Sequence, residues 1–148
     1  MTGKADFTEE EWETVLEGPP SAGIIVSTAQ RGGTFRESFS MAKAYTEARK
    51  QHGESQLLDE IVAAKPKVDR ARERSVEDLK QHHLGLLRNA VALVEGKASP
   101  EEVDAYRRFI IGLAERVAAA KEEGDDPVSE AERAAIGEVM AALGPEAP

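Results

Sequence analysis

Two adjacent histidines, His82 and His83, form the only histidine pair in this chain of 148 residues. Asp78 precedes His82 by four residues, so a helix would carry both side chains on one face at a spacing that suits two metal ligands. His83 points about 100° away from His82, which makes the two rings poor joint ligands. We therefore expect a structural role for His83, on the apolar stripe of its helix. The pair of His82 and Asp78 remains an alternative metal site.

A second candidate for metal chemistry is an acidic segment near the end of the chain. Carboxylate oxygens are the ligands of hard cations such as calcium. The segment departs from the EF-hand pattern, because Pro127 and Val128 stand where oxygen ligands are required and no glycine holds the sixth position. Negative charge beside a helix N-terminus explains the same acids without a metal. The candidate metal ligands are Asp125, Asp126, Glu130 and Glu132.

Patterns that would support catalysis or nucleotide binding are incomplete. The chain has no cysteine, which removes thiolate metal sites and cysteine nucleophiles. Gly32, Gly33 and Thr34 precede a predicted helix, but a phosphate loop also needs a preceding strand and a Gly-Lys-Ser/Thr ending. No serine stands in a recognisable nucleophile motif. These gaps favour a non-enzymatic protein without a cofactor.

The charge of the chain limits the classes of partner. The net charge is −9, with −4 over residues 1–33, +1 over residues 34–96 and −6 over residues 97–148. Such a field repels nucleic acid, and the basic stretch 65–74 contains no aromatic residue for stacking on bases. The longest aliphatic run, Ile24–Val26, is far too short to span a membrane. The acidic N-terminal segment has no apolar run typical of a secretory signal, so we expect a cytoplasmic protein.

Repeated helix-start signals predict an all-α fold. In a capping box, a hydroxyl accepts a bond from the backbone N–H three residues on, and a glutamate there bonds back to the capping residue's N–H. Phe7 and Trp12 flank the first box at the spacing of a hydrophobic staple. The four boxes are Thr8 to Glu11, Thr34 to Glu37, Ser99 to Glu102 and Ser129 to Glu132.

Proline and glycine divide the first half of the chain into short helices. We expect one helix over Glu9–Leu16, ended by the Gly18–Pro20 segment because proline cannot continue a helix. A second short helix over Ser21–Gln30 is apolar nearly all round and is therefore expected in the core. A third runs from Phe35 to about His52. The inner stripe predicted for this third helix is Phe35, Phe39, Ala42 and Thr46, and the apolar residues of a short fourth helix are Leu57, Leu58, Ile61 and Val62.

The second half of the chain predicts longer helices. One of them has two alternative starts: Pro66, which we favour because proline suits a first helical position, and Ser75, which offers a cap. The next begins after Ser99. The last runs over Glu130–Leu143 and ends at Gly144. Its predicted inward-facing residues are Ile136, Val139, Met140 and Leu143.

Both ends of the chain resemble known sequences. The opening residues 6–12 and 22–27, together with the closing residues 128–144, are similar to a family of uncharacterised bacterial proteins. This resemblance implies an all-helical fold and no activity. The closing motif also resembles the helical repeats of TerB-type tellurite-resistance proteins, in which acidic residues near helix starts are associated with metal binding. In this chain Gly124 precedes the acids and Pro127 intervenes, which departs from that order.

We therefore predict an all-α, single-domain bundle of six or seven helices over residues 1–148, with residues 1–7 and 145–148 as loose ends. The leading functional prediction is a cytoplasmic protein-interaction or scaffold protein, with self-association as one form of it. Its partner is expected to meet an apolar face left uncovered by the short N-terminal helices. The alternative prediction is a TerB-like, metal-associated stress-response protein.

Overall fold

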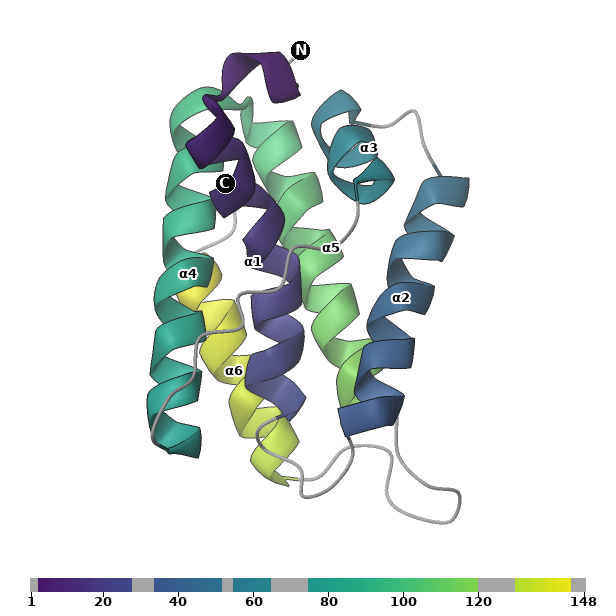
Figure 1. The fold of residues 1–148 in the computed structure, drawn as a ribbon, viewed down its shortest axis with the longest axis vertical. Helices are drawn as coiled ribbons and strands as arrows, with labels where there is room; N and C mark the ends of the chain where they lie inside the picture. The colour runs from purple at the N-terminus through teal and green to yellow at the C-terminus, as the bar shows by residue number, and fades with distance from the viewer. Residues whose placement is uncertain (1–2, 28–33, 52–54, 65–74, 120–129, 145–148) are drawn as a thin grey trace.

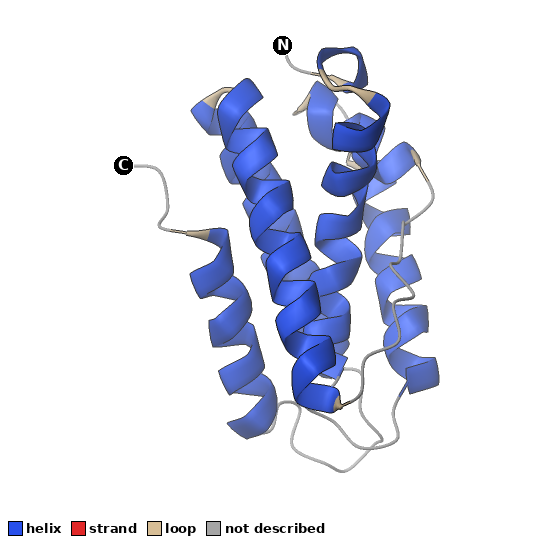
Figure 2. Ribbon diagram, turned by 60° about the vertical axis from the view of Figure 1, so that its left-hand side comes forward, coloured by secondary structure: helices blue, strands red, loops and turns tan. Residues whose placement is uncertain are grey.

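The computed structural model describes residues 3–27, 34–51, 55–64, 75–119 and 130–144. Within these ranges every regular element is helical, which confirms the all-α prediction (Figures 1 and 2). The elements are the 3-10 helix η1 (Lys4–Asp6) and the α-helices α1 (Glu9–Ser27), α2 (Thr34–Lys50), α3 (Gln56–Ala63), α4 (Val76–Lys97), α5 (Pro100–Ala119) and α6 (Glu130–Leu143).

The helix α1 is the central element of the bundle. It packs most extensively against α4 and also contacts α5, α6 and α2. The helices α1 and α5 run in one direction, while α2, α4 and α6 run in the opposite direction (Figure 1). The short α3 lies at one end of the bundle, where it contacts α2 and α5. The described part of α1 is covered by these neighbours. The expected apolar face on the N-terminal helices stays a prediction, since the side chains of residues 28–40 lie outside the described part.

The expected break of the first helix at Gly18–Pro20 is also wrong, because α1 continues through both prolines to Ser27. Pro19 has no N–H for the carbonyl of Val15, four residues earlier, which normally costs a helix a hydrogen bond. The hydroxyl of Tyr106 replaces that donor, at 2.7 Å from the Val15 oxygen. Gly18, Pro19 and Pro20 are all buried. Tertiary packing and this one side-chain bond therefore offset the loss within the helix.

Two of the four predicted capping boxes are confirmed, and those at Thr34 and Ser129 involve side chains outside the described residues. The capping boxes of α1 and α5 are both present, with Thr8 and Glu11 exchanging bonds of 2.9 and 3.1 Å and Ser99 and Glu102 exchanging bonds of 3.0 and 3.3 Å. The helix α4 begins after Ser75, whose backbone is extended and whose hydroxyl accepts a bond from the Asp78 N–H. The favoured long helix from Pro66 is therefore wrong, since an extended residue at the cap interrupts it.

Two predicted inner stripes need correction. On α2 the inward residues are Met41, Ala44, Tyr45 and Ala48, whereas Ala42 and Thr46 are exposed. The Thr46 hydroxyl bonds to the carbonyl of Ala42 on that outer face, at 3.0 Å. The side chains of Phe35 and Phe39 lie outside the described residues. On α6, Met140 faces solvent with 48% of its surface exposed, while Ala135, Val139 and Leu143 are buried.

The described residues 3–7 make contacts with the bundle, within the segment 1–7 that was predicted to be a loose end. Phe7 is buried, and its ring packs on that of Trp12 with centroids 5.7 Å apart, which confirms the staple. The Lys97 ammonium at the end of α4 donates to the Asp6 carbonyl at 2.8 Å and lies 3.2 Å from the Glu11 carboxylate. These contacts fasten η1 to the bundle. Residues 145–148 lie outside the described part.

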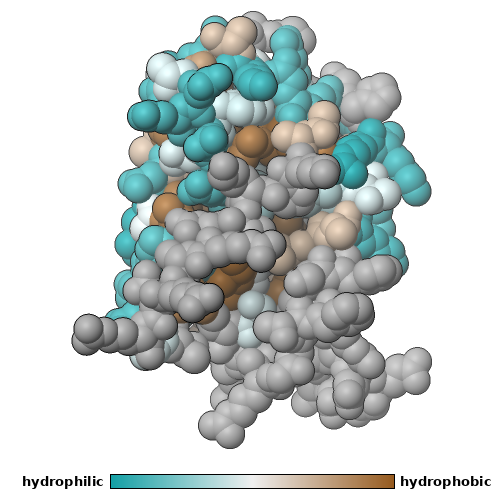
Figure 3. Space-filling view, in the orientation of Figure 1, coloured by the Kyte–Doolittle hydropathy of each residue, from teal (hydrophilic) through white to brown (hydrophobic). Residues whose placement is uncertain are grey.

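The surface of the described residues is largely polar. On the face drawn in Figure 3, hydrophilic residues lie along the upper edge and both upper sides, and hydrophobic atoms show between them. Among the large apolar side chains of the described ranges, only Met140 is exposed. Neither α1 nor any other described helix combines the length and the apolar character that crossing a membrane requires.

Candidate functional site

The side chains of the four predicted metal ligands lie outside the part of the chain that the structure describes. Asp125 and Asp126 lie outside the described residues, and Glu130 and Glu132 fall in the first turn of α6 with side chains that are also outside them. Nowhere in the described ranges do three or more histidine, aspartate or glutamate side chains form a group that could hold a metal ion.

The alternative metal site, formed by Asp78 and His82 of α4, lies at the surface. Asp78 is exposed and His82 is half-buried. The ring of His82 packs edge-on against that of His83, with centroids 5.3 Å apart and planes at 82°. This arrangement turns the two imidazoles away from a shared ion, as the spacing predicts.

His83 forms a buried hydrogen bond that sequence reasoning missed. Its Nδ1 lies 3.1 Å from the hydroxyl oxygen of Ser21, and both residues are only 1% exposed. Serine and histidine at this distance resemble a nucleophile and its base, but burial at this depth keeps a dissolved substrate away from both. The bond instead satisfies two polar groups in the α1–α4 interface. Their separation by 62 residues explains why no local pattern indicated it.

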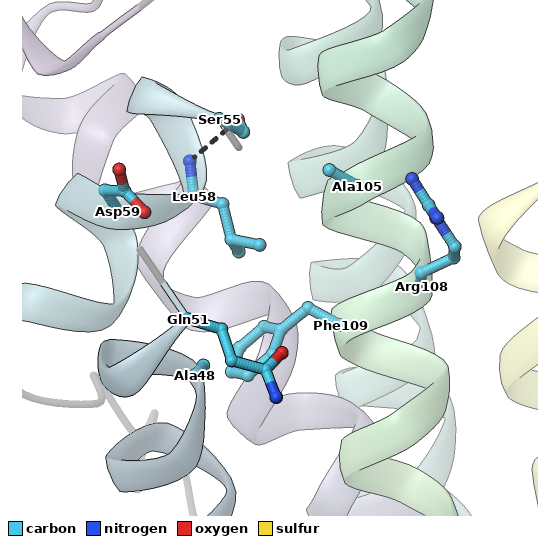
Figure 4. Close-up of a pocket in the computed structure, with 8 residues that line it drawn as sticks. All are labelled: Ala48, Gln51, Ser55, Leu58, Asp59, Ala105, Arg108 and Phe109. Carbon is cyan, nitrogen blue, oxygen red and sulfur yellow. Dashed lines mark hydrogen bonds between the residues drawn. The ribbon is translucent and has the colours of Figure 1, made fainter. Parts of the chain in front are cut away.

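The most site-like feature of the described surface is a depression between α2, α3 and α5, which we call the α2–α5 groove (Figure 4). It consists of two adjoining hollows of about 220 and 190 Å³. The first is lined by Ala48, Gln51, Ser55, Leu58, Asp59, Ala105, Arg108 and Phe109. The second shares Ala48, Gln51, Arg108 and Phe109 with the first and adds Ala44, Glu47, Gly112, Leu113 and Arg116.

The floor of the groove is apolar and firmly supported. Phe109 and Leu58 are only partly buried, so each leaves apolar surface facing the groove. The Phe109 ring rests edge-on against the buried Tyr45 ring, with centroids 5.1 Å apart and planes at 83°. Ala48 and Ala105 leave room on the two walls because their side chains are small.

The rim of the groove carries charges of both signs. The guanidinium of Arg108 lies 3.1 Å from the Asp104 carboxylate, and these side chains are 68% and 38% exposed. An ion pair this exposed contributes little to stability, so Arg108, which lines the groove, remains available to a partner. Arg116 of α5 bonds to Glu47 of α2 across the far end of the groove. The exposed amide of Gln51 adds a donor and an acceptor between these charges.

Local hydrogen bonds fix the positions of the helices that line the groove. Ser55 caps α3 by accepting a bond from the Leu58 N–H at 3.2 Å, which sets the start of the groove's α3 wall (Figure 4). Arg49 near the end of α2 donates to the carbonyl of Val62 near the end of α3 and so holds the two helices together. The groove residues Ala105, Arg108 and Gly112 of α5 follow the three- and four-residue spacing of one helix face.

A larger hollow of about 660 Å³ lies between η1, α1 and α3 and includes Phe7 and Trp12 in its lining. Its lining extends to Ala64, the last described residue before residue 65.

The carboxyl groups with shifted pKa values lie away from the groove. The pKa of Glu11 is lowered first by the Thr8 backbone N–H and then by Lys97, as expected for a capping glutamate. On α4, a bond from Gln81 and then one from Lys80 lower the pKa of Glu77. Lys80 in turn has a raised pKa because of Glu77 and Glu138. These shifts follow from helix capping and ion pairing rather than from the chemistry of a cleft.

The chain matches no family model, no curated protein and no solved structure. The resemblance to TerB-type proteins and to bacterial proteins of unknown activity therefore stays a prediction. None of the residues that line the α2–α5 groove was predicted from the sequence to belong to a site. Asp59 and Arg108 belong to α3 and α5, Gln51 directly follows α2, and only the packing of the three helices brings these residues together.

Proposed function

We propose that this protein is a non-enzymatic protein-interaction or scaffold protein that binds a helical segment of a partner protein in the α2–α5 groove. The observation that carries the proposal is the partly exposed floor of Phe109 and Leu58 between walls that bear both signs of charge. A cytoplasmic location remains part of the proposal and rests on the sequence alone.

The dimensions of the groove favour side chains of a protein over a small ligand. Each hollow is smaller than the roughly 300–1,000 Å³ typical of pockets for small molecules. Along α5 the lining extends from Ala105 to Arg116, which corresponds to about 16 Å, or three helical turns. An amphipathic helix of that length presents apolar residues at i, i+3, i+4 and i+7, which suits two hollows in a row.

The surface outside the groove also favours the groove as the binding site for a partner protein. Only Met140 is exposed among the large apolar side chains of the described ranges, so a broad apolar patch is absent from the surface they form. Arg108 and Asp59 offer contacts for both acidic and basic residues that flank an apolar stripe. Because the chain carries a net charge of −9, a second copy would meet long-range repulsion. A different protein is therefore the favoured occupant over self-association.

Site-specific cross-linking tests this proposal. The chain has no cysteine, so Gln51→Cys creates a unique attachment point for a photoactivated cross-linker on the groove. Arg88→Cys, at an exposed position of α4, is the matched control. In cells that naturally produce the protein, we expect a discrete adduct with one partner from the groove position and none from the control. Equal adduct patterns from both positions would contradict a partner seated in the groove, and an adduct of twice the chain's mass would identify a second copy instead.

A further inference from the structure

The proline pair in α1 leaves two carbonyl groups without their helical donors. Pro19 and Pro20 have no N–H, so the carbonyls of Val15 and Leu16 cannot receive the usual bond from four residues on. Tyr106 of α5 supplies a donor to Val15 at 2.7 Å. This close approach depends on Gly18, because a Cβ there would collide with the Tyr106 hydroxyl oxygen and lie 3.0 Å from the Ala90 Cβ.

Tyr45 brings a further polar group into the core. Its side chain is 1% exposed, and its hydroxyl has no hydrogen-bond partner among the described residues. Burial raises the pKa of Tyr45 far above its usual value, so the hydroxyl keeps its proton and remains a donor. A buried hydroxyl without a partner is unusual in native proteins, where such groups are satisfied by protein or by ordered water.

The packing of three helices places Tyr45 close to the proline pair. A Cβ at Gly23 of α1 would collide with Met41 of α2 and lie 3.2 Å from Leu113 of α5, so these three positions share one level. The helices α1 and α2 are antiparallel (Figure 1). One turn forward along α2, from Met41 to Tyr45, therefore corresponds to one turn back along α1, from Gly23 to Pro19, and places Tyr45 at the level of Pro19.

The spacing of residues along α5 places Tyr106 and Tyr45 in the same part of the core. One turn back from Leu113 is Phe109, whose ring contacts the Tyr45 ring with centroids 5.1 Å apart. Tyr106 lies one further turn along the same helix. The pKa of Tyr106 is raised mainly by burial and secondarily by Tyr45, which agrees with neighbouring hydroxyls.

We propose that a buried water molecule is bound between the hydroxyls of Tyr45 and Tyr106 at the proline pair of α1. The water accepts a hydrogen bond from the Tyr45 hydroxyl and donates one to the Tyr106 hydroxyl oxygen. Tyr106 donates its own hydrogen bond to the Val15 carbonyl. The Leu16 carbonyl is a third group of the right kind at this level. Buried waters typically make about three such bonds to otherwise unsatisfied groups. The site is therefore a fixed part of the core, and it does not depend on the function of the α2–α5 groove.

A high-resolution crystal structure of the full chain tests the site directly. We expect an ordered solvent oxygen within about 2.7–3.2 Å of the Tyr45 hydroxyl and of at least one other polar atom. Electron density that shows only carbon atoms around the Tyr45 oxygen would overturn the proposal.

Thermal melts of Tyr45→Phe, Tyr106→Phe and the double variant give an independent readout, because phenylalanine preserves the packing of each ring. We expect Tyr45→Phe to lower Tm, and the loss in the double variant to be smaller than the sum of the single losses, because both hydroxyls hold one water. An unchanged or higher Tm for Tyr45→Phe would overturn the proposal, since removing an unsatisfied hydroxyl costs nothing.

Discussion

The hydroxyl of Tyr106 donates a 2.7 Å hydrogen bond to the carbonyl of Val15, the carbonyl that Pro19 deprives of its helical donor. The two residues are 91 positions apart. Through this bond, α5 completes the hydrogen bonding of α1, so the central helix of the bundle depends on a side chain from another helix. The continuity of α1 is thus a property of the tertiary structure rather than of its own sequence.

Removing the Tyr106 hydroxyl tests this dependence. In Tyr106→Phe the buried carbonyl of Val15 loses its donor, which we expect to lower the free energy of unfolding by about 1–3 kcal/mol. For a domain of this size, that corresponds to a Tm lower by about 2–4 °C per kcal/mol. Thr46→Val also removes one hydroxyl, but at an exposed position, and is expected to change stability by less than about 0.5 kcal/mol. Equal changes in the two variants would show that the Val15 carbonyl does not need Tyr106.

The contact between α1 and α5 also requires glycine at position 18. We expect Gly18→Ala to destabilise the fold, because its Cβ would collide with the hydroxyl oxygen of Tyr106 beside the rigid proline pair. Gly137→Ala on α6 is the matched control, since a Cβ there meets nothing within 4 Å and alanine favours a helix by about 0.5–1 kcal/mol over glycine. Chemical denaturation of both variants measures the difference. A stabilising Gly18→Ala would refute the close packing of the two helices.

Local chemistry was enough to predict the helix starts at Thr8 and Ser99, because a cap depends only on residues three apart. The same kind of cap marked Ser75, but the start at Pro66 was favoured over it. The course of α1 through its prolines was not predictable in this way, since its compensating donor comes from Tyr106. The inner face of α2 was misjudged for a related reason. Aromatic and small residues occur on several faces of that helix, and only the contact with α5 selects Tyr45.

The candidate site depended still more on tertiary structure. Each wall of the α2–α5 groove is a short run of ordinary helix residues such as Ala48, Leu58 and Ala105. No motif joins them, and Arg108 with Asp104 resembles any surface ion pair within a helix. The groove exists because α2 and α3 both pack against α5, an arrangement that sequence periodicity does not specify.

The capping glutamate of α1 predicts a component of acid sensitivity. The folded pKa of Glu11 is below its ordinary value of 4.5, so its contribution to stability is complete above that value and is lost as the pH falls through the lower folded value. Glu11→Gln keeps the shape of the capping box and removes the charge. We expect the variant to be less stable than the wild type at neutral pH and equally stable in strong acid.

Thermal melts across a pH series measure this difference. Glu95→Gln, at an exposed position of α4, is the control and is expected to follow the wild type throughout. A constant difference between Glu11→Gln and the wild type at every pH would show that the charge of Glu11 has no stabilising partner in the fold.

The metal prediction can be tested without knowing a partner. Melts with EDTA and then with calcium, magnesium or zinc report any ion that binds the folded chain, since a ligand at 100 times its Kd adds about 2.7 kcal/mol. A stabilisation that disappears in Asp125→Ala/Asp126→Ala would support the TerB-like prediction. If Tm is unchanged with all three ions, that prediction fails.

The groove as a binding surface is tested most directly by blocking it within the cross-linking experiment. Ala105→Arg places a long side chain on the α5 wall, at a half-exposed position where a helix accepts arginine readily. The measurement is the yield of partner adduct from Gln51→Cys with and without this block, at equal Tm. The proposed function predicts that the adduct is lost in the blocked chain and retained when Arg88→Glu is introduced instead. An undiminished adduct in the blocked chain would contradict the α2–α5 groove as the site of binding.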